Sequence, residues 1–159
     1  MRVGGTPDAD FRPRWQVAAG GSWRLKDGGN ATVITIDARQ SRFLAGDVQA
    51  LTPGLEQYLL GGRAWLTARW INLFDENGRH QSGYLLRGDV DATDSLHVFA
   101  GFSDAPDTSE GIVIETRSYF GGLSYRLSDR LVARVNLAVE DRETGYDRAQ
   151  IGSGIGLRF

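Results

Sequence analysis

The stretch Ala149-Gln150-Ile151-Gly152-Ser153-Gly154-Ile155-Gly156-Leu157-Arg158-Phe159 ends the chain and decides how the rest of it folds. Its odd-numbered positions are mostly apolar, whereas the even-numbered ones are Gln, Gly, Gly, Gly and Arg. Because successive side chains of a β-strand point to opposite faces, this period of two predicts a strand with one apolar face. A soluble domain seldom keeps a bulky aromatic in a strand at its last residue, since termini tend to fray.

The same alternation recurs along the whole sequence. Nine segments of about ten residues carry it, at 14–25, 31–39, 49–60, 63–73, 81–90, 95–103, 116–127, 130–141 and 148–159. The connections between them carry hairpin-turn chemistry, for example Asp75-Glu76-Asn77-Gly78 and Gly61-Gly62. The sequence therefore predicts one all-β domain over residues 14–159, an antiparallel up-and-down meander of about 8–10 strands, preceded by an irregular lead over residues 1–13.

The spacing of aromatic residues indicates what the apolar face meets. Trp15 and Trp23 share the apolar side of segment 14–25. In a strand tilted by about 40°, they lie about 20 Å apart along a barrel axis. This is close to the separation of the aromatic girdles that bound the apolar band of a membrane barrel. We therefore expect a transmembrane β-barrel whose membrane-interface aromatics are Trp15, Trp23, Trp70, Tyr119 and Phe159.

Loop lengths give this barrel an orientation. With Phe159 at the periplasmic end, the external connections are 142–147, 104–115, 74–80 and 40–48, and the periplasmic ones are 128–129, 91–94, 61–62 and 26–30. Each external loop is longer than its neighbours, as in outer-membrane barrels. Nine strands conflict with the even number of such barrels, so we expect either an extra strand that includes 11–14 or a missing N-terminal portion. The first ten residues lack the apolar core of a signal peptide, which also fits a missing portion.

Composition excludes several classes of protein. The net charge of -2 and the pI near 5.7 leave no electrostatic footprint for nucleic acid. There is no cysteine for a disulfide or a thiolate metal site. No apolar run approaches the roughly 18 residues of a transmembrane helix.

Two resemblances sharpen the expectation. Gly154, Leu157 and Phe159 resemble the C-terminal signal that the barrel-assembly machinery of bacterial outer membranes reads. The stretches Thr52-Pro53-Gly54-Leu55, Gly101-Phe102-Ser103-Asp104-Ala105-Pro106-Asp107 and Tyr119-Phe120-Gly121-Gly122-Leu123-Ser124-Tyr125-Arg126, with Tyr58 and Trp65, are similar to the YaiO-type outer-membrane β-barrel family. This resemblance implies a bacterial outer-membrane location, contact with membrane lipids and lipopolysaccharide, and in some members a link to envelope polysaccharide. It implies no catalytic residue, cofactor or metal.

Charged residues on the opposite face from the apolar one are the candidate functional set. They are Arg24, Glu56, Arg69, Arg87, Asp89, Arg126, Arg134, Glu140 and Arg158. One interpretation is a salt-bridged plug, because buried charges need partners and arginine pairs bidentately with carboxylates. The other is a narrow passage whose excess of arginine favours anionic solutes.

Other functions find less support in the residues. His80 and Ser82 would share one face of an extended chain, but no acidic partner is evident, so we expect a solvated loop rather than the catalytic set of a lipid-modifying enzyme. His97 is expected to be a hydrogen-bonded interior residue. The predicted loop 104–115 is acidic but lacks calcium-binding spacing. A soluble lipocalin-like ligand-binding barrel remains an alternative, with the opposite polarity of faces.

Overall fold

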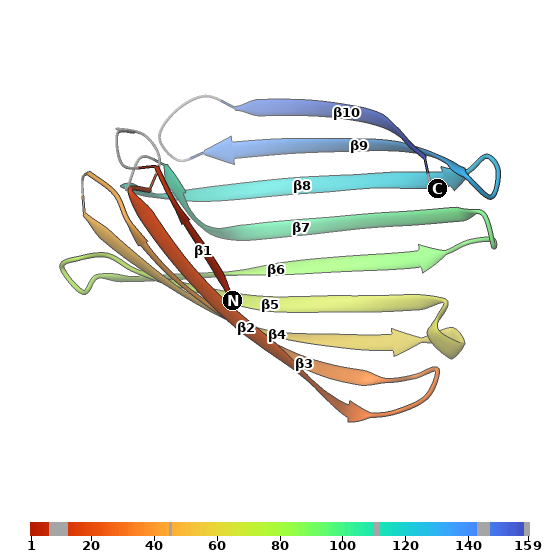
Figure 1. Ribbon diagram of the computed structural model, residues 1–159, viewed down its shortest axis with the longest axis horizontal. Helices are drawn as coiled ribbons and strands as arrows, with labels where there is room; N and C mark the ends of the chain where they lie inside the picture. Colours follow the sequence, from red (N-terminus) through yellow and green to blue (C-terminus); the bar gives the residue numbers. More distant parts are fainter. Residues whose placement is uncertain (7–12, 45, 110–111, 143–146, 158–159) are drawn as a thin grey trace.

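Ten β-strands form one antiparallel sheet in chain order (Figure 1). The computed structural model describes residues 1–6, 13–44, 46–109, 112–142 and 147–157. The strands are β1 (Arg2–Gly5), β2 (Trp15–Lys26), β3 (Thr32–Arg42), β4 (Asp47–Leu59), β5 (Ala64–Phe74), β6 (His80–Asp91), β7 (Leu96–Ser109), β8 (Ile112–Arg126), β9 (Leu131–Arg142) and β10 (Arg148–Leu157), with a short 3-10 turn, η1 (Leu60–Gly62), after β4. The prediction of an all-β, up-and-down antiparallel meander is confirmed. Among the described strands β1 does not pair with β10, so the sheet is open.

Register separates the side chains into two faces. One row of directly paired residues crosses nine strands and contains Trp23, Ile34, Leu55, Ala68, Leu86, Phe102, Tyr119, Val139 and Ala149. The adjacent row points the other way and contains Arg24, Val33, Glu56, Thr67, Arg87, Gly101, Phe120, Ala138 and Gln150. We call the first side the outer face and the second the inner face.

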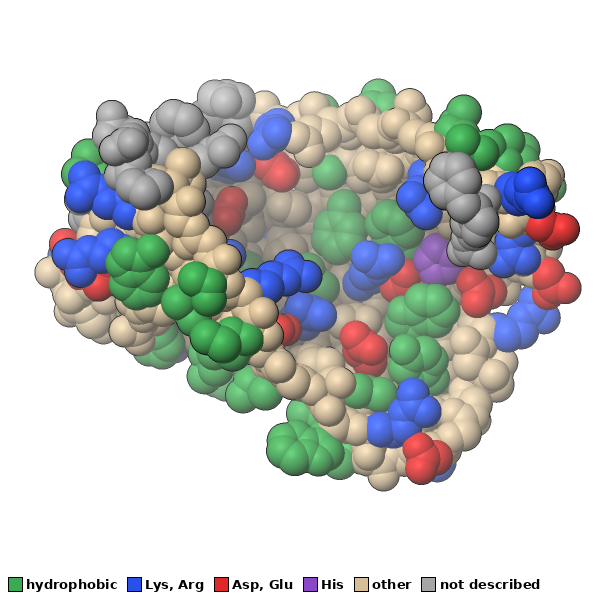
Figure 2. Space-filling view, in the orientation of Figure 1, with side chains coloured by type: hydrophobic (Ala, Val, Ile, Leu, Met, Phe, Trp, Pro, Cys, Tyr) green, Lys and Arg blue, Asp and Glu red, His purple; other side chains and the backbone are tan. Residues whose placement is uncertain are grey.

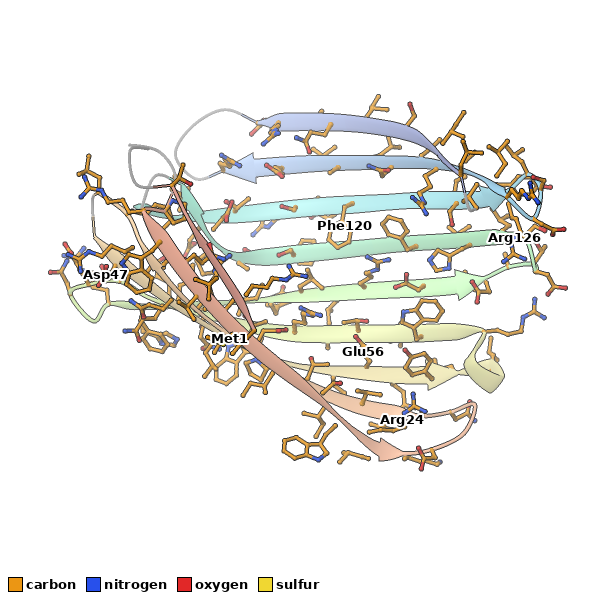
Figure 3. All side chains as sticks on the ribbon, in the orientation of Figure 1. Met1, Arg24, Asp47, Glu56, Phe120 and Arg126 are labelled. Carbon is orange, nitrogen blue, oxygen red and sulfur yellow. The ribbon has the colours of Figure 1, made fainter. Side chains whose placement is uncertain are left out.

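The sheet curls around its inner face. Strands β1 and β2 cross in front of the middle strands in Figure 1. The molecule is hollowed on this side, and acidic, basic and histidine side chains line the hollow in Figure 2. Glu56 and Phe120 lie over the middle of the sheet, and Arg24 and Arg126 lie nearer the end where β6 turns into β7 (Figure 3).

A cluster of buried apolar side chains lies at the opposite end of the sheet. There Phe43, Val48 and Leu73 are buried against one another, with Ala50 packed beside them. The nearby β5–β6 turn is held by Asp75, whose Oδ1 accepts hydrogen bonds from the backbone N–H of Asn77 at 2.9 Å and of Arg79 at 2.8 Å. Gly78 completes the turn with φ 74, a conformation that favours glycine. The turn chemistry of the sequence thus acts as expected.

Two expectations about chain segments were wrong. The lead over residues 1–13 is not wholly irregular, because β1 pairs antiparallel with β2, Gly5 opposite Trp15. The stretch 104–115 is not an external loop, because β7 and β8 continue their pairing to Ser109 opposite Ile112. Asp104 lies in that hairpin and accepts hydrogen bonds from Arg117 across the strands at 2.9 and 3.2 Å, so its charge supports the pairing. The predicted contrast in loop length disappears with it.

Glycines that neighbouring strands and rings approach closely allow the packing of the sheet to be tested by substitution. A Cβ at Gly122 would lie 2.6 Å from the Val135 carbonyl oxygen and 2.9 Å from the Phe99 ring, whereas one at Gly21 meets nothing within 4 Å. We expect Gly122→Ala to lower the free energy of unfolding by about 1–3 kcal/mol through overpacking, and Gly21→Ala to change it by less than about 0.5 kcal/mol. Equilibrium unfolding in urea measures both. Equal effects would contradict the described packing.

Candidate functional site

A buried carboxylate organises the inner face. Asp89 lies on β6, and its side chain is 1% exposed. Arg87 lies two residues earlier on the same face and donates Nε–H to Asp89 Oδ2 at 2.7 Å and Nη2–H to Asp89 Oδ1 at 2.6 Å. This bidentate geometry is among the strongest charge-assisted pairings that proteins use. The ion pair therefore fixes the Arg87 guanidinium against the sheet.

His97 on β7 extends this pair to a second carboxylate. Its Nδ1 lies 2.9 Å from Asp91 Oδ1, and its Nε2 lies 3.2 Å from Asp89 Oδ1. Asp91 and His97 are direct partners in the β6–β7 register, because they flank the turn between these strands. Both ring nitrogens thus face carboxylate oxygens, which accept hydrogen bonds when ionised. The imidazole acts as a bridge between two acids.

Aromatic rings cover this polar cluster. Tyr58 stacks on Trp65 with ring centroids 5.8 Å apart, and Trp65 stacks on His97 at 5.4 Å. The Arg87 guanidinium lies 4.2 Å from the centroid of the Phe99 ring. Such stacked and cation–π contacts restrict the side chains they join. The result is a connected set of stacked rings and paired charges that spans β4 to β7.

A small open pocket lies next to this cluster. Its volume is about 100 Å³, and its lining includes Asp91, Ser95, His97, Ser124 and Arg126. These residues come from β6, the turn that follows it, β7 and β8. The pocket is polar, and it connects the cluster to the arginines of the later strands.

The predicted inner-face charges share a face but not one network. Register places on the inner face Arg24, Glu56, Arg69, Arg87, Asp89, Arg126, Arg134 and Glu140, whereas Arg158 lies outside the described residues. Within this set only Arg87 and Asp89 pair with each other.

The other described members pair with a nearby residue outside the set or have no partner among the described residues. Arg69 lies 3.5 Å from Asp37 on β3, and Glu140 lies 3.1 Å from Arg142 on its own strand. Arg24 lies 3.9 Å from Asp27. Glu56, Arg126 and Arg134 make no side-chain hydrogen bond or ion pair within the part of the chain that the structure describes. Among the described residues these charges therefore form separate local pairs rather than one connected salt-bridge network.

Sequence reasoning missed three members of the cluster. Asp91 was assigned to a turn, while Tyr58 and Trp65 were noted only as family-like residues. A signal was present: Asp91 and His97 bracket the turn residues 92–95 symmetrically, so a hairpin sets them opposite each other. The expectation that His97 is hydrogen-bonded is confirmed. Trp65 and Trp70 lie on opposite faces of β5.

On the outer face the predicted interface aromatics are exposed. Trp15, Trp23, Trp70 and Tyr119 are all exposed there, whereas Phe159 lies outside the described residues. Of the predicted insertion signal, Gly154 and Leu157 belong to β10. His80 corrects another expectation, since it begins β6 rather than lying in a loop. Its Nε2 lies 3.0 Å from Asn72 Oδ1, and its ring stacks on Phe74.

Neither a search for metal sites and membrane-spanning helices nor a comparison with known proteins assigns this chain to a class. Among the described residues no three or more histidines and carboxylates are arranged to hold a metal ion, and no helix there is long and apolar enough to cross a membrane. The chain matches no family model, no curated protein and no solved structure.

The burial of Asp89 gives a test of the cluster. Asp89→Asn removes the charge that Arg87 and His97 share, so we expect a loss of about 2–3 kcal/mol in the free energy of unfolding. Asp37→Asn is the matched control, because this half-exposed acid lies 3.5 Å from Arg69 on the same face. We expect it to cost about 0–1 kcal/mol. Urea unfolding of both variants decides, and a control as damaging as Asp89→Asn would mean that the cluster is not central to stability.

Proposed function

We propose that this chain forms a β-barrel that spans a bacterial outer membrane, with its outer face toward lipid and a non-enzymatic role. The observation that carries the proposal is the outer face itself. It exposes large apolar side chains on strand after strand, among them Trp23 at 74%, Ile151 at 81% and Ile155 at 73%. Soluble monomers rarely expose contiguous apolar patches larger than a few hundred Å². A bilayer would bury this surface.

The distribution of aromatic residues supports the same orientation. Trp70 is paired with Tyr84, and Tyr84 with Asp104, which carries the ion pair to Arg117. Along β7 and β8 the paired rings of Phe102 and Tyr119 are followed, two residues closer to the β7–β8 turn, by the ion pair of Asp104 and Arg117, as expected where a barrel leaves the hydrocarbon. Trp23 lies near the end of β2 and Tyr125 near the end of β8. Both are at the end of the sheet away from the β7–β8 turn, and both supply aromatic rings for the other interface.

The strand count is compatible with a closed barrel. In hydrocarbon every unpaired backbone group costs several kcal/mol, so membrane sheets close into rings. Ten antiparallel strands leave β1 and β10 running in opposite directions, and an antiparallel closure is therefore available. We propose that membrane lipids and lipopolysaccharide surround the outer face and that the barrel-assembly machinery reads β10. On the resemblance to the YaiO-type family, we also propose a link to envelope polysaccharide.

The alternative classes fit the two faces less well. A lipocalin-like barrel would place apolar side chains inside, whereas Val135, Leu137 and Leu157 are exposed on the outer face. A lipid-modifying enzyme needs a histidine free to act on a nucleophile. Within the described residues no hydrogen bond joins His80 or His97 to a serine or threonine hydroxyl; their ring nitrogens contact Asn72 and the carboxylates of Asp89 and Asp91.

Adjacent residues on opposite faces of β9 test the membrane proposal. Leu137 belongs to the outer face and Asn136 to the inner face, and both are exposed. At the bilayer midplane an outward arginine costs about 2–4 kcal/mol, so we expect Leu137→Arg to block refolding into phosphatidylcholine vesicles. Asn136→Arg should fold like the unchanged chain. The readout is the folded fraction, from circular dichroism and from tryptophan quenching by brominated lipid. Equal tolerance of both arginines would reject lipid contact at this face.

A narrow passage is the second candidate function. It is favoured by the hollow of the inner face and by the exposed arginines there that lack partners in the described chain (Figure 2). Such a lining favours anions.

Planar-bilayer recording tests the passage. We expect single-channel currents with chloride favoured over potassium, and a fall of about twofold in that preference for Arg134→Ala, because one fixed positive charge is removed. Arg130→Ala, in the exposed β8–β9 turn, serves as a control that should change the preference less. A folded, inserted chain that carries no current at any voltage would exclude the passage and leave the barrel proposal intact.

A further inference from the structure

Two arginines on neighbouring strands of the inner face differ from the rest. Arg87 and Arg69 each have a carboxylate partner, Asp89 and Asp37 respectively. Arg126 on β8 and Arg134 on β9 are exposed and make no side-chain hydrogen bond or ion pair in the described part of the chain. Their charges are therefore available to a bound anion.

Register brings these arginines to one place. Ser124 is the direct partner of His97 on β7 and of Arg134 on β9, and Arg126 follows two residues later on the same face. Diagonal neighbours on adjacent antiparallel strands have Cα atoms about 7–8 Å apart, within reach of two long side chains. The hydroxyl of Ser124 thus lies between a guanidinium and an imidazole that is already held by acids.

The neighbouring strand leaves space above this point. The inner face of β10 carries Gly152, Gly154 and Gly156, and a Cβ at Gly154 would meet nothing within 4 Å. A Cβ at Gly156 would lie 3.6 Å from Arg134 Nη1, so the absence of side chains there makes room for the guanidinium. On the β7 side the pocket of about 100 Å³ is lined by Ser124 and Arg126.

Two carboxylates line the pocket, and neither forms an ion pair with Arg126 or Arg134 within the described residues. Asp91 lines the pocket, but it bonds to His97 at 2.9 Å. Asp94 also lines it from the turn after β6. The direct partners of the two arginines on β8, β9 and β10 are Val132 for Arg126 and Ser124 and Gly154 for Arg134, none of which neutralises a positive charge.

We propose that Arg126 and Arg134, with the Ser124 hydroxyl, bind a phosphate group at this end of the inner face. Two planar guanidinium forks match the oxygens of a phosphate dianion, and serine adds a neutral donor. The phosphate belongs either to a soluble phosphate monoester or to a lipid headgroup, since both present the same oxygens. The site is built from side chains of the inner face and does not depend on the membrane proposal.

Titration of the full chain in detergent micelles with inorganic phosphate tests the site, with calorimetry and ³¹P line broadening as readouts. We expect saturable binding, weakened about tenfold or more by Arg126→Gln or Arg134→Gln, because each removes a charge-assisted pair. Arg24→Gln is the matched control: it removes an exposed inner-face arginine on β2, 3.9 Å from Asp27, and should leave affinity within about twofold. Arg134→Lys keeps the charge but loses the fork, and should bind with intermediate affinity. Unfolding midpoints show that each variant is folded.

Two further arms identify the source of the phosphate. Glucose 1-phosphate represents soluble monoesters, and vesicles of phosphatidic acid against phosphatidylcholine represent headgroups. If Arg134→Gln abolishes binding of only one of these two probes, that probe identifies the source of the phosphate. The proposal is overturned if phosphate shows no saturable binding up to about 10 mM, or if all three glutamine variants weaken it equally, which would indicate only the diffuse positive field of the face.

Discussion

The register of the antiparallel sheet is the constraint on which the rest of the structure depends. Each strand alternates its side chains, and nine consecutive pairings keep the alternation in phase from β1 to β10. A slip of one residue at any pairing would carry apolar side chains to the inner face and charges to the outer face. The row from Trp23 to Ala149 is apolar or aromatic at every position, so each strand reinforces the register of its neighbours.

This register also assembles the inner-face site from segments that are distant in sequence. The polar cluster takes Tyr58 from β4, Trp65 from β5, Asp89 from β6 and His97 from β7, all brought together by cross-strand pairing. The buried Asp89 carboxylate accepts two hydrogen bonds from Arg87 and lies within hydrogen-bond distance of the His97 ring. An isolated charge there would be costly, but the bidentate Arg87 and the His97 ring compensate for the lost hydration.

Sequence patterns predicted the parts of the fold that depend on alternation and missed those that depend on particular partners. Nine strands were predicted because each carries a strong period of two, and all but β7 and β8 lie within three residues of their observed bounds. β1 was missed because four residues, Arg2-Val3-Gly4-Gly5, are too few to show a period. The acidic stretch after Phe102 resembled a loop, yet Asp104 lies opposite Arg117 and its charge favours a strand pair. For the site, alternation correctly assigned the face of each described charge. It could not assign partners, because an arginine side chain can reach acids on its own strand or the next.

The position of the acids on β6 explains why Arg87 has a carboxylate partner whereas Arg126 and Arg134 have none among the described residues. Asp89 and Asp91 are two residues apart on one strand, and they engage Arg87 beside them and His97 on β7. Over β8 and β9 neither carboxylate forms an ion pair with Arg126 or Arg134, whose direct partners are Val132 for the first and Ser124 and Gly154 for the second. The same sheet therefore holds a cluster of paired charges over β4–β7 and, over β8–β9, two arginines that pair with no acid among the described residues. A structural role suits the first, because its charges are satisfied internally, and recognition of an anion suits the second, because its charges are not.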